Sequence, residues 1–213
     1  CGGRTQSGTD LGGGNVPDGK YTDDSAEQQD PPASPLDLRL FLSGWPKGFD
    51  RPSSYVYPAH ARWTRAIPAK DLEEKLNRKF NIGKLRGLRM LRRAPSGHVD
   101  SLLIIGSKKN KKLDDEMDIR SLLGVGSLRS TMFVLDTEYR KDHPPAPKPV
   151  KGKKAAKPAP VLIPETFVFR GGGWGHAVGL CQSGAMGRAE AGQNYETIIR
   201  SYFRGVEIGR LDY

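Results

Sequence analysis

Residues 167–185 of this chain read FVFRGGGWGHAVGLCQSGA. A short run typical of a β-strand leads into glycines that surround Trp174 and His176. Glycine adopts positive φ angles and lets other groups approach closely, and it costs stability elsewhere. The stretch therefore predicts a strand followed by a tight loop that carries an aromatic wall and a titratable group. A plain turn with a core tryptophan and a hydrogen-bonded histidine is the alternative interpretation.

The rest of the chain predicts an α+β fold: a twisted, mostly antiparallel sheet with a few short helices and long, extended loops. Pro68 suits the first turn of a helix through about Phe80, with Leu72 and Leu76 on one face. Apolar alternation and turn residues place the other elements. Strands are expected over 85–91, 99–105, 130–136 and 206–211, and helices over 119–123, 185–191 and 195–203.

Two segments have the composition of loops rather than of a core. Residues 1–35 are rich in Gly, Ser, Asp and Pro and predict a flexible segment. Residues 36–213 predict one domain, interrupted at 140–160 by a Lys/Pro/Ala-rich insertion that joins two of its strands.

The chain is basic, with 34 Lys and Arg against 24 Asp and Glu and a formal net charge of +10. The basic residues gather in 84–93, 108–112 and 141–157, a pattern that suits either polyanion binding or a solubilising surface. No nucleic-acid-binding signature accompanies them, so no nucleic-acid partner is expected. No apolar run approaches the length of about 18 residues that a membrane-spanning helix needs.

The run GWGHAVGLCQSGA resembles the C-terminal signature of the stage II sporulation protein D and amidase-enhancer family, GWGHGVG(M/L)xQxGA. The resemblance extends from about Arg62 to the end of the chain, with the family's motifs in the family's order. They are Arg62-Trp63-Thr64, Ser96-Gly97-His98-Val99, Ile119-Arg120, Leu128-Arg129-Ser130-Thr131-Met132-Phe133 and Ser201-Tyr202-Phe203.

The resemblance implies an exported bacterial lytic transglycosylase of the cell envelope, which cuts peptidoglycan glycan strands with one Glu as general acid. That Glu lies upstream of a family motif that Cys1-Gly2-Gly3-Arg4-Thr5 resembles, so no catalytic residue is assigned within this chain. A non-enzymatic peptidoglycan-binding module or amidase activator is the alternative, and a cell-wall amidase is the implied protein partner.

The resemblance also implies which residues bind the glycan. Trp174 is expected to stack on a sugar ring, and His176 and Gln182 to hydrogen-bond its polar groups. Ser96 and Arg129 are expected to line or brace the same region. No cofactor is required for this role.

The two cysteines, Cys1 and Cys181, leave three alternatives open. They form a disulfide, which is typical of exported proteins; they bind zinc together with His176, as the resemblance implies for some relatives; or they are unlinked thiols. Cys1 itself also has a second interpretation, as the lipidated first residue of a lipoprotein with a flexible tether.

Overall fold

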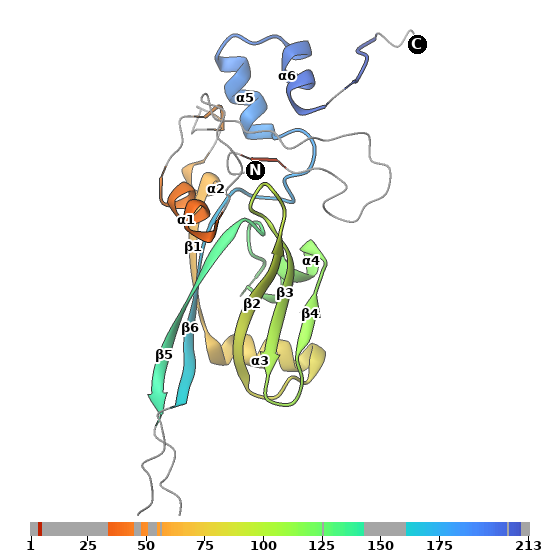
Figure 1. The fold of residues 1–213 in the computed structure, drawn as a ribbon. Coiled ribbons are helices and arrows are strands. Elements are labelled where there is room, and N and C mark those ends of the chain that lie inside the picture. Colours follow the sequence, from red (N-terminus) through yellow and green to blue (C-terminus); the bar gives the residue numbers. More distant parts are fainter. Residues whose placement is uncertain are drawn as a thin grey trace, which may run out of the picture.

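The computed structural model describes residues 4–5, 34–44, 48–50, 55, 57–124, 126–142, 161–203 and 205–209. The fold is α+β, as predicted, and both of its sheets are antiparallel (Figure 1). The sequence predicted one sheet, whereas the structure has two, with three strands each. Each sheet buries one face against the other and against helices, so two small sheets share one core.

The first sheet has the strand order β1-β6-β5, with β1 at Arg62–Pro68, β5 at Phe133–Asp142 and β6 at Val161–Gly172. Strands β5 and β6 pair from Phe133↔Gly171 to Asp142↔Val161. The chain between them, residues 143–160, covers most of the predicted insertion and lies outside the described residues. The two strands on either side of this segment are neighbours in one sheet.

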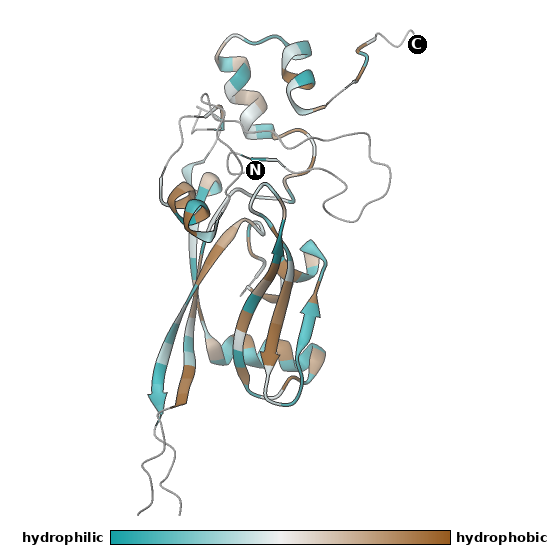
Figure 2. Cartoon of the chain, in the orientation of Figure 1, coloured by the Kyte–Doolittle hydropathy of each residue, from teal (hydrophilic) through white to brown (hydrophobic). Residues whose placement is uncertain are grey.

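The second sheet has the order β2-β3-β4, with β2 at Leu85–Arg93, β3 at Val99–Gly106 and β4 at Lys111–Leu113. Its central strand β3 is the most buried, and Figure 2 shows hydrophobic colour along it. Leu102 and Ile104 of this strand are fully buried. Since residues 102–105 form a continuous apolar run, a central strand is the position that suits them.

The main core lies between the two sheets and is closed by helices α3 (Ala69–Phe80) and α4 (Glu116–Leu122). Helix α3 begins after Pro68, which ends β1, and it turns Leu72 and Leu76 into the core. The aromatic part of the core is contributed by the first sheet, with Trp63, Phe133, Phe167 and Phe169. These rings hold the end of β6, and with it the start of the glycine-rich loop.

Helix α1 (Pro35–Ser43) packs a second, smaller core on β5. The ion pair between Arg39 and Asp136, at 2.6 Å, fastens the helix to the strand. Residues 4–5 differ from the predicted flexible segment, because both are buried and the guanidinium of Arg4 stacks 4.1 Å from the Phe41 ring centroid. The remainder of that segment, apart from residues 34–35, lies outside the described residues.

Three short helices lie at the end of the molecule where β6 ends: α2 (Pro58–Ala61), α5 (Gln182–Glu190) and α6 (Tyr195–Tyr202) (Figure 1). Gly192, with φ of +82°, follows α5 in the left-handed conformation in which many helices end. The strand predicted over 206–211 is wrong for its described part, since residues 205–209 contain no strand. A strand needs a neighbour to satisfy its backbone, and apolar alternation alone does not supply one. Within the described residues, no helix has the length and apolar character to cross a membrane.

Candidate functional site

Backbone hydrogen bonds hold the glycine-rich loop after β6 to two other parts of the chain. The amide of Gly173 donates to the carbonyl oxygen of Ala61 at 3.1 Å, which ties the loop to the end of α2. The amide of Gly175 donates to the carbonyl oxygen of Arg129 at 2.8 Å, which ties it to the segment before β5. The loop is therefore fixed on both sides of Trp174.

Trp63 supports the start of the same loop from the core. Its indole Nε1 donates to the carbonyl oxygen of Gly173 at 2.9 Å. A Cβ atom at position 171 would lie 2.3 Å from the indole ring, so only glycine lets the strand end lie on this ring. Trp63 is itself a residue of the main core.

Several residues of the loop have left-handed backbone conformations. Gly173, Gly175 and Gly179 have φ of +78°, +107° and +76°, which glycine adopts without a steric penalty. Ala177, between them, has φ of +59°. A non-glycine residue in this conformation costs about 1–2 kcal/mol, and such residues cluster at functional sites.

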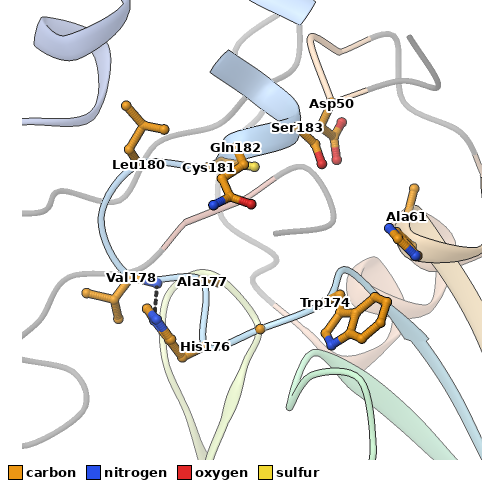
Figure 3. A pocket seen from close by; sticks show the side chains of 12 residues that line it. Asp50, Ala61, Trp174, His176, Ala177, Val178, Leu180, Cys181, Gln182 and Ser183 are labelled. Atoms are coloured by element: carbon orange, nitrogen blue, oxygen red, sulfur yellow. Dashed lines mark hydrogen bonds between the residues drawn. The ribbon is translucent and has the colours of Figure 1, made fainter. Parts of the chain in front are cut away.

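The loop forms one wall of an open cavity of about 470 Å³ (Figure 3). The opposite walls come from helix α2, the N-terminus of α5 and the segment around residue 50. The predicted binding residues Trp174, His176 and Gln182 all line this cavity. The other lining residues are Asp50, His60, Ala61, Gly175, Ala177, Val178, Leu180, Cys181 and Ser183.

Trp174 presents an accessible aromatic ring to the cavity, because 56% of its surface is exposed. The imidazole of His60 packs edge-on against this ring. The two ring centroids lie 4.6 Å apart, and the interplanar angle is 86°. The guanidinium of Arg129 lies 5.7 Å from the Trp174 ring centroid, within the range of a cation–π contact. The indole is thus held from two directions while part of it stays open for stacking.

His176 is exposed, and its Nδ1 accepts a hydrogen bond from the amide of Val178 at 3.0 Å. An amide N–H can donate only to an unprotonated ring nitrogen, so the neutral ring carries its proton on Nε2. His176 can therefore offer an N–H donor to a ligand while the loop backbone fixes its orientation.

Helix α5 brings polar groups to the cavity at its first turn. Cys181 is the N-cap residue, with its Sγ 3.4 Å from the amide nitrogen of Gly184, and Gln182 and Ser183 follow it. Cys181 is in a disulfide, and Cys1 is the one other cysteine of the sequence. Of the three alternatives for the cysteines, the structure therefore agrees with the disulfide for Cys181.

The predicted zinc set of Cys1, His176 and Cys181 stays a prediction, because the structure describes two of its three members. A disulfide sulfur is not the thiolate that zinc requires, so Cys181 in its observed state does not serve as a ligand. Cys1 lies outside the described residues. The described part of the chain contains no group of three or more His, Cys, Asp or Glu side chains arranged to hold a metal ion.

Ser96, also predicted as a binding residue, is fully buried and does not line the cavity. Its Oγ lies 2.8 Å from Nδ1 of His98, which is also fully buried. Burial lowers the pKa of His98 to about 3, with smaller contributions from Arg93 and His176. The Ser96–His98 pair is therefore a neutral, buried support close to the loop. Arg129 lies behind Trp174 rather than in the lining.

Three polar lining residues were not predicted: Asp50, His60 and Ser183. Ser183 lies within the glycine-rich signature itself, and His60 precedes the Arg62-Trp63-Thr64 motif, so both had a local signal. Asp50 had none. Its position depends on helix α5: a Cβ atom at Gly187 would lie 1.7 Å from the carbonyl oxygen of Phe49, so the backbone before Asp50 lies directly on the helix.

Over residues 18–179 the chain matches the family described as a domain of unknown function, DUF8618. This match spans well over half of the chain, and the chain belongs to that family. The matched region includes Trp174 and His176 and ends shortly before helix α5.

Two curated proteins are similar to short parts of the chain. The amidase enhancer of Bacillus subtilis (strain 168) is 40% identical over 42 residues, which are 20% of this chain and 6% of that protein. An uncharacterized protein of Brachyspira hyodysenteriae is 44% identical over 47 residues, 22% of this chain and 12% of that protein. The chain thus matches a small share of each relative's length. The similarity to an amidase enhancer is therefore partial.

Proposed function

We propose that this chain binds the glycan strands of peptidoglycan in the bacterial cell envelope, and that it forms part of a lytic transglycosylase. The observation that carries the proposal is the convergence of Trp174, His176 and Gln182 on one open cavity. An exposed indole, an imidazole with Nε2–H and a side-chain amide are the groups with which proteins bind the faces and polar substituents of sugars. The partial similarity to an amidase enhancer supports the same context.

An exported location agrees with the disulfide at Cys181, because disulfides persist in oxidising compartments and are rare in the cytosol. The basic balance of the chain also suits the acidic polymers of a bacterial envelope. The periplasm or the cell wall is the proposed location.

Glycan binding is tested directly by cosedimentation of the chain with purified peptidoglycan. Trp174→Ala should weaken the affinity for peptidoglycan about fivefold or more, since stacking of one aromatic ring contributes on the order of 1 kcal/mol. Tyr139→Ala is the matched control: Tyr139 is an exposed aromatic residue of β5, outside the cavity. Wild-type protein that stays in the supernatant would overturn the proposal.

The alternative is a non-enzymatic role, as a peptidoglycan-binding module or amidase activator. It is favoured by one feature of the site: the described residues that line the cavity include no glutamate, the residue type that the family resemblance assigns as the general acid. The family resemblance places the acid elsewhere in the intact protein. Anhydro-muramyl products from stripped glycan strands, treated with the natural full-length protein, support the enzyme. Binding without cleavage supports the module, and stimulation of an added cell-wall amidase supports the activator.

A further inference from the structure

Asp50 is the one acidic side chain among the described residues that line the cavity, and neither the sequence motifs nor the family resemblance gives it a role. Asp50 is 6% exposed, so its carboxylate is buried in the wall rather than dissolved in the surrounding water. In Figure 3 it lies beside Ser183, across the cavity from His176.

The position of Asp50 is built by close packing. Gly187 of α5 lies against the carbonyl of Phe49, and the guanidinium of Arg188 stacks 4.4 Å from the Phe49 ring centroid. The same helix supplies Gln182 and Ser183 to the cavity at its first turn. One helix therefore fixes the carboxylate and two neutral polar side chains relative to each other.

The charge of Asp50 lies near the half-buried guanidinium of Arg62, on which the positive charge of Arg4 also acts. Burial lowers the pKa of Arg62, and the negative charge of Asp50 acts against this effect. Arg62 is held there by the carbonyl oxygens of Gly44, Ala61 and Phe41, and it does not line the cavity. Asp50 thus lines the cavity, whereas the guanidinium of Arg62 lies outside the lining.

The other titratable groups near the cavity differ from Asp50 in kind. His60 and His176 line it as imidazoles, while Arg129 and Arg188 lie behind Trp174 and Phe49. Among the described lining residues, a ligand thus finds one acceptor with a negative charge, opposite the Nε2–H donor of His176. A carboxylate accepts hydrogen bonds from hydroxyl and amide groups and repels a second carboxylate at short range.

We propose that Asp50 is a specificity-determining residue of the glycan site: its carboxylate hydrogen-bonds a neutral N-acetylglucosamine unit and disfavours N-acetylmuramic acid, whose lactyl group carries a carboxylate in stripped glycan. This inference rests on the proposed function. It adds which sugar of the alternating strand occupies the cavity, and so sets the register in which a strand binds.

The test is a calorimetric titration with two probes, the neutral triacetylchitotriose and the anionic disaccharide N-acetylglucosaminyl-N-acetylmuramic acid. Wild-type protein should bind the neutral probe at least about fivefold more tightly than the anionic one. The carboxylate of the anionic probe would lie close to that of Asp50, and the repulsion between them weakens binding. Asp50→Asn, which keeps the shape and removes the charge, should weaken binding of the neutral probe several-fold and abolish the preference. Asp142→Asn, an exposed aspartate at the far end of β5, is the control and should behave as wild type.

Equal or tighter binding of the anionic disaccharide by wild-type protein would overturn the inference, whether or not the variant folds. So would an Asp50→Asn variant with an unchanged melting temperature and an unchanged preference. Protein that sediments with peptidoglycan yet binds neither probe contradicts the role of Asp50 and leaves the proposed function standing. Protein that fails to sediment contradicts the proposed function itself.

Discussion

The indole of Trp63 donates a hydrogen bond to the carbonyl oxygen of Gly173, 2.9 Å away, and so links the hydrophobic core to the residue that precedes Trp174. Trp63 is buried, at 8% exposure, and supports the backbone next to Trp174, which is 56% exposed at the cavity. This arrangement requires a glycine at the end of the strand, because a Cβ atom at position 171 would collide with the ring of Trp63.

Trp63→Phe should therefore weaken both the fold and the site. The variant loses the hydrogen bond and leaves the Gly173 carbonyl without this donor, at a cost of about 1–3 kcal/mol in the free energy of unfolding measured with urea. Trp174→Phe is the control: it removes no buried hydrogen bond that the described structure records, so it should lower stability by less than 1 kcal/mol. Equal loss in both variants would contradict the supporting role of Trp63.

Ala177→Gly should raise stability. Ala177 has φ of +59°, and the family signature has glycine at this position. Removing the methyl group relieves the strain of the left-handed conformation. Glycine also raises the entropy of the unfolded chain, which offsets part of this effect, so the free energy of unfolding should rise by about 0.5–1 kcal/mol. Ala189→Gly, at an exposed position of α5, should lower stability by about 1 kcal/mol instead. Thermal unfolding of both variants distinguishes the signs.

Gly187→Ala should displace Asp50 without altering any lining residue. The new methyl group would lie 1.7 Å from the Phe49 carbonyl oxygen, so the segment before Asp50 must move away from α5. We expect a loss of about 1–3 kcal/mol in stability and weaker glycan binding. Gly87→Ala is the matched control, because a Cβ atom there meets nothing within 4 Å. Unchanged sugar binding by Gly187→Ala would mean that the segment's position is not important for the site.

The buried His98 predicts a specific pH dependence of stability. Its pKa in the folded protein is about 3, below the ordinary value of 6.5, so protonation favours the unfolded chain. Its contribution to stability is complete above pH 6.5 and falls by up to about 1.4 kcal/mol per pH unit as the pH drops towards 3.

His98→Gln removes this titration. Urea unfolding at several pH values should show a stability difference between wild type and variant that shrinks steadily from pH 6.5 to pH 4. A difference that stays constant over this range would show that His98 is accessible to protons in the folded state.

The disulfide at Cys181 predicts a response to reductant. Cys181 caps α5, which carries Gln182 and supports Asp50, so its loss should loosen this side of the cavity. Reduction should cost about 2–4 kcal/mol in stability and weaken peptidoglycan binding. Cys181→Ser should show the same stability with and without reductant, and Cys1→Ser should match it, since the sequence contains no other cysteine. A wild-type melting temperature that does not respond to reductant would contradict the expectation.

Local pattern was sufficient for most of the secondary structure. Helix α3 follows from Pro68 and the spacing of Leu72 and Leu76, and the central strand β3 follows from an apolar run between turn residues. The glycines around Trp174 and His176 predicted a tight, exposed loop because their backbone requirement is local. The division into two sheets was not predictable in this way, since hydrophobic alternation marks a strand's buried face but not its neighbour.

The sequence alone determined that Trp174, His176 and Gln182 belong to one site, because they lie within a few residues of each other on one loop and one helix start. Only the tertiary structure brought Asp50 and His60 to the opposite wall, through the contact of Gly187 with Phe49 and the packing of His60 on Trp174. Such contacts join residues more than a hundred positions apart, and they depend on the shape of the folded backbone. That shape is a property of the whole core, so no short motif encodes the acidic side of the cavity.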